Sequence, residues 1–371
     1  MHSESGRARL WQPARRLACW NRPCTPRAPR HPPHLPTQFA DLSLSVVVST
    51  VCGMKRLWSV GIALAALELV PGEPSDLTAV LRSPDDRRAL LGDEAELGVE
   101  LGFQLRSVRP VTTALSPLAQ YLVEHLDHGR VENWVKILER GVRDGRYRPM
   151  LLGWQEYPAR LRDTWDAPPI LFRGLASGGQ NGQSASWNAP TDDQGQRTLA
   201  IVGGRKATPQ VLASTAEVAS AVAAEEFRVI SGLAAGVDTA AHRAALEVGG
   251  TTTAVMGTGI DRVFPAQNKT LAREIAERGV LLSQFAPPAP RTGTTFLRRN
   301  CVIAALSDAS LIMDGRSQSG SRNAIEQAIR YGKPAFLWRP ALDREQWAHE
   351  TARVGVATFV DSADDLLKRL R

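Results

Sequence analysis

The sequence predicts an α/β protein with a doubly wound, Rossmann-like parallel sheet over residues 198–371. Three observations lead to this prediction. Six short, apolar, β-rich runs recur in this region, helix-length segments separate most of them, and glycine-containing turns follow several of them. A chain that alternates strands with helices makes right-handed crossovers, and these produce a parallel sheet with helices on both faces.

The expected strands are the runs TLAIVGG, RVISGLA, TTTAVMG, VLLSQF, ASLIMDG and PAFLWRP, and ATFVDS near the end is a candidate for a seventh. The expected helices cover 208–226, 238–248, 268–278, 295–306 and 319–332. In sheets of this kind, ligands bind outside the carboxyl ends of the strands, where the strand order reverses. We therefore look for a functional site in the turns after the strands.

The region before this sheet is expected to be a small helical domain over residues 54–150. The stretches 115–126 and 131–142 carry apolar residues at three- and four-residue spacing, which is typical of amphipathic helices. Residues 151–197 hold a short predicted strand followed by a stretch rich in Gly, Ser, Gln and Asn. This composition indicates a flexible linker and a domain boundary.

Residues 1–53 are expected to be a basic, proline-rich extension. The first forty residues show no periodicity and predict disorder. The apolar segment 42–52 is shorter than the roughly 18 to 20 residues that span a bilayer, so we expect no membrane span. A signal peptide is one alternative. We favour a true start at Met54, in which case residues 1–53 would be dispensable for folding and ligand binding.

Composition narrows the function classes. An apolar share of 43% and a charged share of 22% over 371 residues are typical of a soluble globular protein. Residues 1–60 hold nine basic and two acidic residues, which accounts for the whole net charge of +7. The rest of the chain holds 36 residues of each sign, so a surface for an anionic partner must be a local patch there.

Cysteine usage is typical of a reducing compartment. Three of the four cysteines lie in the first 60 residues, and the fourth is Cys301. No disulfide framework is implied, so we expect a cytoplasmic protein. Because Cys301 stands in an apolar run, we expect its thiol in the core and redox-inert.

The turns after the strands carry residue types that bind anions. Helix N-termini expose unpaired N–H groups, glycines let a phosphate approach them, and basic side chains add full charges. The candidates are Gly203, Gly204, Arg205 and Lys206 after the first strand, Ser231 and Gly232 after the second, and Ser319, Gly320 and Ser321 at a later helix start.

Neighbouring polar residues have structural alternatives. Asp238 fits a helix N-cap, His242 a packed helix residue and Glu326 an exposed helix charge. The Arg-Arg-Asn run at 298–300 fits either a solvated helix face or a binding site. The sequence has no metal-binding cluster, Walker lysine loop or nucleophile elbow. We therefore expect anion binding with no catalytic residue, no metal and no cofactor.

Five stretches together resemble the DNA-processing protein A family (DprA, also called Smf). They are IVGGRKA, SGLAAGVDTAAHRAAL, AVMGTGIDRVFPAQNKTL, FLRRNCVIAALSDASLIM and SQSGSRNAIEQAI, in the order and spacing of the family's motifs. YPARLRDTWDAPPILFRG also resembles the stretch that precedes the domain in that family. The resemblance covers about residues 155–340, and SGLAAGVDTAAH is its most specific part.

The resemblance implies an extended Rossmann fold that binds single-stranded DNA, usually as a homodimer. It also implies a non-enzymatic protein that hands the strand to the RecA recombinase during natural transformation. By position, it assigns a DNA contact to Arg205 and adds further candidates. These are Asn268 and Lys269 at the end of the FPAQNK element, the arginine–asparagine pair Arg299 and Asn300, and the adjacent Arg298.

The sequence departs from the family pattern at several positions. Gly204 stands where the family has Ser, Cys301 replaces an arginine and so removes one basic contact, and Arg322 replaces a hydrophobic residue. Many members continue into a winged-helix domain, which we do not expect in this chain.

Two other functions stay open. One is a nucleotide sensor or a nucleotide-processing enzyme of a related Rossmann family. That family's P-G-G-x-G-T-x-x-E motif is missing, and SGSRNAIEQ has the wrong spacing for its glutamate. The other is a DprA-like component of a defence system, which neighbouring genes would distinguish.

Overall fold

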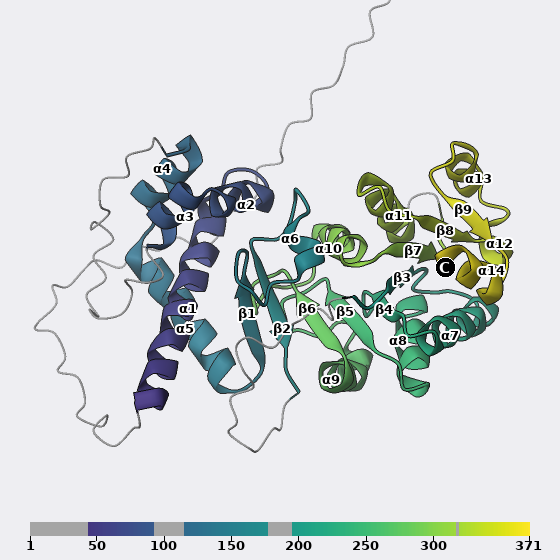
Figure 1. Ribbon diagram of the computed structural model, residues 1–371, viewed down its shortest axis with the longest axis horizontal. Coiled ribbons are helices and arrows are strands. Elements are labelled where there is room, and N and C mark those ends of the chain that lie inside the picture. Colours follow the sequence, from purple (N-terminus) through teal and green to yellow (C-terminus); the bar gives the residue numbers. More distant parts are fainter. Residues whose placement is uncertain (1–43, 93–114, 177–194, 317–318) are drawn as a thin grey trace, which may run out of the picture. The chain divides into compact units, whose positions relative to one another are not determined.

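A computed structural model describes residues 44–92, 115–176, 195–316 and 319–371 (Figure 1). Residues Val48–Arg371 form one compact unit. The extension predicted to be disordered over 1–40 lies outside the described residues, as does most of the predicted linker.

The nine strands of the described residues form one sheet in the order β1-β2-β6-β5-β4-β3-β7-β8-β9. The seven strands from β3 to β9 run parallel, whereas β1 and β2 pair antiparallel with each other and with β6. All seven expected strands are therefore confirmed. The strands are β1 Tyr147–Leu151, β2 Ile170–Gly174, β3 Thr198–Val202, β4 Arg228–Ser231, β5 Thr252–Met256, β6 Val280–Ser283, β7 Ala309–Ile312, β8 Ala335–Trp338 and β9 Thr358–Val360.

Helices cover both faces of the sheet (Figure 1). The five helices expected between the strands are confirmed within two residues at each end. They are α7 Pro209–Ala224, α8 Val237–Glu247, α9 Lys269–Arg278, α10 Gly293–Leu306 and α11 Gly320–Arg330, followed by α12 Arg339–Leu342, α13 Gln346–Arg353 and α14 Ala363–Leu370. Alternate residues of β3 serve two cores: Leu199 and Ile201 join the core under α7 and α8, whereas Ala200 and Val202 join the core shared with α10.

The strand order reverses between β3 and β7. The chain moves outward from β3 through β4 and β5 to β6, and α10 then carries it back across the sheet to β7 on the other side of β3. The carboxyl ends of β3 and β7 therefore border a crevice. This is the topological position at which ligands bind to open α/β sheets.

The N-terminal region is helical, as expected, over most of its described length. Its helices are α1 Leu44–Leu69, α2 Pro74–Arg82, α3 Pro84–Leu91, α4 Pro117–His125 and α5 His128–Arg143. Helix α1 runs without a break through Met54, so a chain starting at Met54 would begin inside this helix. None of the described helices is both long and apolar enough to cross a bilayer.

Two features differ from the sequence expectation. Residues 147–151 form the strand β1 although the region was expected to be helical, and β1 and β2 extend the sheet beyond the boundary expected at residue 198. Pro149 at the centre of β1 makes this strand difficult to predict from the sequence. A proline donates no backbone hydrogen bond and is tolerated on an edge strand, which is where β1 lies.

Tight packing of α5 against β1 joins the helical region to the sheet. Tyr147 is fully buried, its ring meets Phe172 edge-on at 5.6 Å between centroids, and its hydroxyl donates to the carbonyl of Ile137 at 3.3 Å. Gly141 on α5 leaves room for this ring, because a Cβ there would lie 2.1 Å from the Tyr147 hydroxyl oxygen.

We predict that Gly141→Ala lowers the free energy of unfolding by about 1–3 kcal/mol, because a methyl group must displace a buried ring. Gly129→Ala on the same helix is the control. A Cβ at Gly129 meets only the Asp127 carboxylate, at 3.3 Å. This variant should be neutral or up to about 1 kcal/mol more stable, since alanine favours helix. Urea unfolding of both variants checks the prediction, and equal stabilities would contradict it.

Candidate functional site

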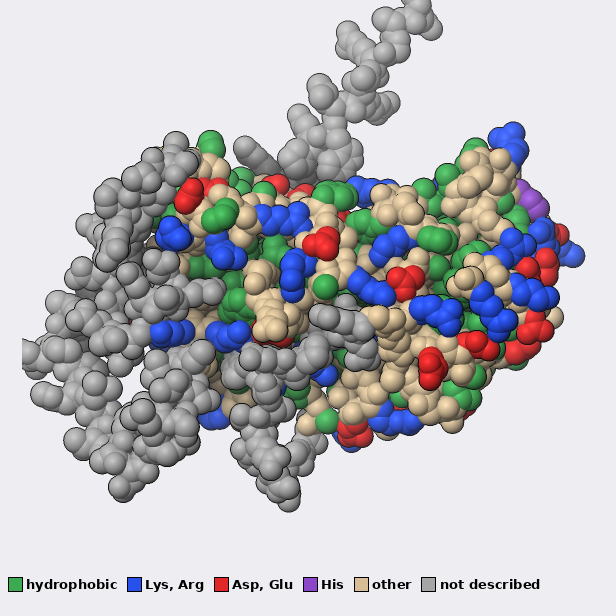
Figure 2. Space-filling view, viewed as in Figure 1, with side chains coloured by type: hydrophobic (Ala, Val, Ile, Leu, Met, Phe, Trp, Pro, Cys, Tyr) green, Lys and Arg blue, Asp and Glu red, His purple; other side chains and the backbone are tan. Residues whose placement is uncertain are grey.

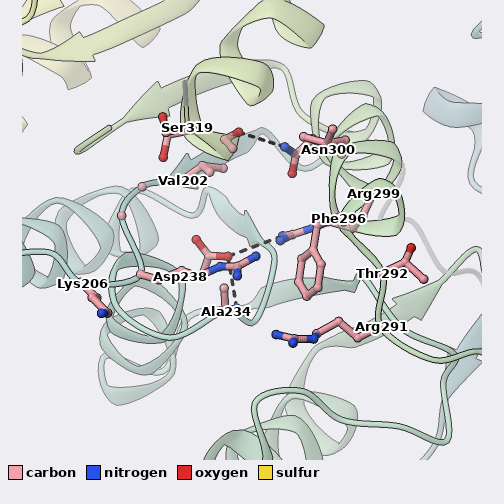
Figure 3. Close-up of a pocket in the computed structure, with 17 residues that line it drawn as sticks. Val202, Lys206, Ala234, Asp238, Arg291, Thr292, Phe296, Arg299, Asn300 and Ser319 are labelled. Atoms are coloured by element: carbon pink, nitrogen blue, oxygen red, sulfur yellow. Dashed lines mark hydrogen bonds and ion pairs between the residues drawn. The ribbon is translucent and has the colours of Figure 1, made fainter. Parts of the chain in front are cut away.

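A cavity of about 790 Å³ opens at the carboxyl end of β3, at the reversal point of the sheet (Figure 3). It lies between the loop after β3, the turn before α8, and the N-terminal halves of α10 and α11. Nine of the candidate residues line it. They are Gly203, Gly204, Arg205, Lys206, Arg299, Asn300, Ser319, Gly320 and Ser321.

Local hydrogen bonds fix the elements around this cavity. The backbone N–H of Val237 donates to the carbonyl of Gly204 at 3.2 Å, which ties the loop after β3 to the start of α8. Thr292 caps α10 by accepting from the N–H of Thr295 at 3.1 Å, and Ser319 caps α11. The helix starts at the cavity are therefore held by their own side chains.

A buried ion pair forms the floor of the cavity. Arg299 projects from α10 with 4% of its surface exposed, and its Nη1 lies 3.5 Å from Oδ2 of Asp238, which is 2% exposed. Figure 3 shows this pair at the centre of the site. Asp238 also accepts from the N–H of Ala234 at 3.2 Å. Burial raises the pKa of Asp238 and lowers that of Arg299, and the attraction between the two opposes both shifts.

The Arg299 guanidinium is not saturated by this pair. Its buried Nε has no hydrogen-bond partner among the described residues, and its buried Nη1 has none beyond the ion pair with Asp238. Leaving a buried charged donor without an acceptor costs several kcal/mol. Because the side chain also lines the cavity, the missing acceptor is expected to come from a ligand.

Gly232 makes this arrangement possible. A Cβ at this position would lie 0.9 Å from Nη1 of Arg299. Any other residue would therefore displace the guanidinium from its place above Asp238. The sequence predicted Gly232 to be a binding residue, but it does not line the cavity. It instead creates the space in which the buried side chain of Arg299 lies.

An aromatic ring stands over the same cavity. Phe296 on α10 lies under the guanidinium of Arg205, with 4.6 Å from Cζ to the ring centroid. Phe264 meets Phe296 edge-on at 6.1 Å, and Arg291 covers Phe264 at 4.5 Å. The sequence reasoning missed these two aromatic residues. The only signal was their place inside the FPAQN and FLRRN stretches.

The sequence around this cavity matches a known protein family. The sequence pattern of the family described as DNA recombination-mediator protein A matches residues 149–371, which include the sheet from Pro149 of β1 onward and every residue that lines the cavity. The chain belongs to this family.

Two relatives illustrate the membership. Protein Smf of Synechocystis is 32% identical over 181 residues, which cover 49% of this chain and 43% of that protein. DNA processing protein DprA of Streptococcus pneumoniae is 33% identical over 180 residues, covering 48% of this chain and 58% of that protein. The chain therefore spans about half the length of these relatives.

Two solved structures of the family share the fold. The X-ray structure of S. pneumoniae DprA covers 81% of this chain and 98% of its own, at 24% identity and a TM-score of 0.56. A structure of the Helicobacter pylori protein, determined to explain its single-stranded DNA binding mode, covers 60% of this chain and 95% of its own. Its identity is 25% and its TM-score 0.50. The extended Rossmann fold that the resemblance implied is thus confirmed.

The other predicted site residues lie outside the cavity wall. Ser231 is buried and donates to the carbonyl of Ile201 at 2.6 Å. Asn268 is buried and donates to the carbonyl of Leu233 at 2.9 Å, where Leu233 has a φ of 59°. A non-glycine residue in this region is strained by about 1–3 kcal/mol, so Asn268 stabilises a strained turn next to the site.

Two basic residues of the prediction lie on the surface. Lys269 is exposed at the start of α9. Arg298 faces away from Arg299 and forms an ion pair with Glu73 at 3.6 Å. The run 298–300 therefore splits: one arginine is on the solvated face, while Arg299 and Asn300 are buried at the cavity.

The geometry decides two of the structural alternatives. The expectation that Asp238 caps α8 is wrong, because Gly236 occupies the N-cap and Asp238 lies in the first turn, paired with Arg299. Glu326 is an exposed helix charge, as expected, and pairs with Arg322 at 3.1 Å.

The expectation that Cys301 lies in the core is wrong. Its side chain is half-buried, and its thiol donates to Oε1 of Gln327 at 3.4 Å. Burial raises its pKa, which keeps the thiol protonated near neutral pH. The helical turn that places Arg299 inward turns Cys301 toward the surface between α10 and α11.

No group of three or more His, Cys, Asp or Glu side chains in the described part of the chain is arranged to hold a metal ion. The cavity is lined by four cationic side chains, Arg205, Lys206, Arg291 and Arg299, and by the single carboxylate of Asp238. This excess of positive charge favours an anionic ligand.

His242 is packed in α8, as expected, and it is fully buried. Its Nδ1 lies 2.7 Å from Oγ1 of Thr252, which itself donates to the carbonyl of Val229. Nδ1 must therefore carry the proton. Burial, and secondly the charge of Arg299, lower the pKa of His242 to about 3, so the ring is neutral in the folded state.

We predict that His242 makes the fold acid-sensitive. In the unfolded chain its pKa is about 6.5, so the unfolded state binds a proton between pH 6.5 and 3 that the folded state excludes. The contribution of His242 to the free energy of unfolding is therefore fully present above pH 6.5 and is lost progressively as the pH falls. Between pH 7 and 5 the loss attributable to His242 is about 2 kcal/mol.

His242→Asn keeps a donor near Thr252 but does not titrate, so it should lose about 2 kcal/mol less than the wild type between these pH values. Urea unfolding at pH 7 and pH 5 measures the difference. Equal losses would show that His242 is not the buried neutral group described.

Proposed function

We propose that this protein binds single-stranded DNA, with a backbone phosphate in the cavity at the carboxyl end of β3. The observation that carries this proposal is Arg299, a buried guanidinium that lines a cavity with four cationic side chains and whose Nε has no hydrogen-bond partner among the described residues. A phosphate supplies several acceptor oxygens and a negative charge, and a guanidinium binds it in bidentate geometry.

Two exposed cations extend the phosphate site outward. Arg205 and Lys206 are exposed, and neither has a carboxylate partner within salt-bridge distance in the described part of the chain. Several other surface arginines are paired with acids. At the α12–α14 end, basic and acidic side chains are intermixed on the face in Figure 2, as in the Arg339–Asp361 pair at 2.8 Å. Four cationic side chains, Arg205, Lys206, Arg291 and Arg299, are grouped at the cavity, where DNA could use them together.

The position of Phe296 favours the binding of single-stranded DNA over the binding of a duplex. Bases of a single strand are free to stack on an aromatic side chain, which adds about 1–3 kcal/mol per base with little sequence preference. The ring lies beside Arg205 and Arg299. A phosphate and the adjacent base could therefore be held together. The H. pylori relative, whose structure describes a single-stranded DNA binding mode, supports the same assignment.

We further propose a mediator role rather than an enzymatic one. The family name, recombination mediator, supports a protein that delivers the strand to a RecA-type recombinase. A homodimer acting in the cytoplasm would suit this role in transformation or general recombination.

A mononucleotide sensor is the second candidate. A cavity of about 790 Å³ is within the range of small-molecule pockets, and it would also hold one nucleotide. Fluorescence anisotropy with labelled oligo-dT separates the candidates. Unlabelled oligo-dT should compete strongly, duplex weakly, and mononucleotide only at far higher concentration. Competition by mononucleotide at equal concentration would favour the sensor.

We predict that Arg205→Ala weakens oligo-dT binding by about 1–3 kcal/mol, because it removes a charged hydrogen bond to a phosphate. The slope of log affinity against log salt should become shallower by about 0.7, the value for one phosphate of a single strand. The melting temperature should barely change, since Arg205 is exposed and has no ion pair among the described residues.

Arg369→Ala is the matched control, because Arg369 is also exposed but pairs with Asp365 on α14 outside the cavity. It should alter neither affinity nor salt slope. A normally folded Arg205→Ala protein with the wild-type slope would remove Arg205 from the site. A lowered melting temperature with an unchanged slope would mean that Arg205 stabilises the turn instead.

A further inference from the structure

An exposed tryptophan lies on the segment between α6 (Ala159–Arg162) and β2. Trp165 is 56% exposed, although tryptophan is among the residues that proteins most often cover. The guanidinium of Arg330, the last residue of α11, covers the ring at 5.1 Å from Cζ to the ring centroid. No residue of the cavity takes part in this contact, so the cavity site leaves Trp165 unexplained.

Hydrogen bonds fix the residue next to Trp165 and the arginine over its ring. The hydroxyl of Tyr331 donates to Oδ1 of the adjacent Asp166 at 2.7 Å, and burial together with this bond raises the pKa of Tyr331. Arg330 in turn donates to Oε1 of Gln327 at 3.3 Å. The chain beside Trp165 is therefore tied to Tyr331 at the end of α11, and the ring itself contacts Arg330. An exposed ring that is pre-ordered in this way loses little entropy when a ligand stacks on it.

The outer face of α10 connects this ring to the cavity. Leu297 lines the cavity and is 45% exposed. Cys301 follows one turn later on the same face, and its thiol meets Gln327, which also holds Arg330. Leu297 and Cys301 thus lead from the cavity mouth along α10, and the buried Gln327 links Cys301 to Arg330, which covers the exposed Trp165. We call this stretch between the cavity and Trp165 the α10–α11 track.

The charges along this track suit a polyanion. Arg330 has no carboxylate partner within salt-bridge distance among the described residues. Arg298 borders the track and is held by Glu73 at 3.6 Å, a distance at which a surface pair contributes little. The acid nearest to Trp165 in sequence, Asp166, already accepts from Tyr331.

We propose that Trp165 and Arg330 form a second subsite that stacks a base of the same DNA strand whose phosphate occupies the cavity. This inference rests on the proposed function. Beyond the proposed function, it specifies the path of the strand over the protein, which runs from the cavity along the α10–α11 track. One ring face is covered by Arg330, and the base stacks on the ring or on the guanidinium, as aromatic and arginine side chains do with single strands.

The test is a length series of oligo-dT, from about 4 to about 20 nucleotides, which brackets the site sizes of single-strand-binding folds. Anisotropy is measured for the full chain and for Trp165→Ala. The variant should bind long oligonucleotides about 5- to 150-fold more weakly, the effect of losing one stacked base. It should bind the shortest oligonucleotides like the wild type, because these reach only the cavity.

Two further variants separate stacking from folding. Trp165→Phe keeps an aromatic face and should recover most of the affinity for long strands. Tyr121→Ala removes an aromatic side chain of similar exposure, 40%, from α4, and should have no effect at any length. Circular dichroism of each variant checks that it is folded.

The outcomes distinguish this subsite from the proposed function. If the wild type binds oligo-dT and Trp165→Ala binds every length equally well, the subsite is wrong while the cavity proposal stands. If Trp165→Ala weakens all lengths equally, the track does not extend the cavity and the inference is also wrong. If the wild type binds no oligo-dT, both proposals fail. Loss confined to long strands, with recovery by Trp165→Phe, supports the subsite.

Discussion

The site depends on one buried ion pair, Arg299 with Asp238. Each charge would be costly to bury alone, and together they are held by elements that are distant in sequence: Asp238 lies in the first turn of α8 and Arg299 in the second turn of α10. The pair therefore requires both helices in their places on opposite faces of the sheet. It also leaves Nε of Arg299 without a hydrogen-bond partner among the described residues, beside a cavity whose cationic side chains outnumber its acids.

The surrounding residues can be understood from this constraint. Gly232 is bare because the guanidinium occupies the place of a side chain. Asn268 holds the strained carbonyl of Leu233 in the turn between β4 and Asp238. His242, one turn after Asp238, stays neutral because it is buried and close to Arg299. A second positive charge there would repel the first. Most of the motif SGLAAGVDTAAH thus serves to hold the side chain of Arg299 in its buried position.

The sequence allowed the sheet to be predicted because its strands are short apolar runs bounded by glycine, and because parallel strands with helical crossovers leave few possible topologies. It also located the cavity, since residues 203–206 and 319–321 follow strand ends that must meet at one edge. It could not show that Arg299 turns inward while Arg298 turns out, because the spacing fits either face until the partner Asp238 is known. The strand β1 was missed because Pro149 contradicts local strand preference, and only its edge position permits it.

The two ends of the sheet limit how copies of this protein can meet. Among the described strands, β1 lies at one edge and is interrupted by Pro149, and β9 at the other edge is only three residues long, Thr358–Val360. Short edges and edge prolines prevent another strand from adding to a sheet. These edges disfavour a pair of chains that continues one sheet into the next, and they favour packing through side chains of helices and loops. Such an interface can be separated by changing a few surface residues without disturbing the central β-structure.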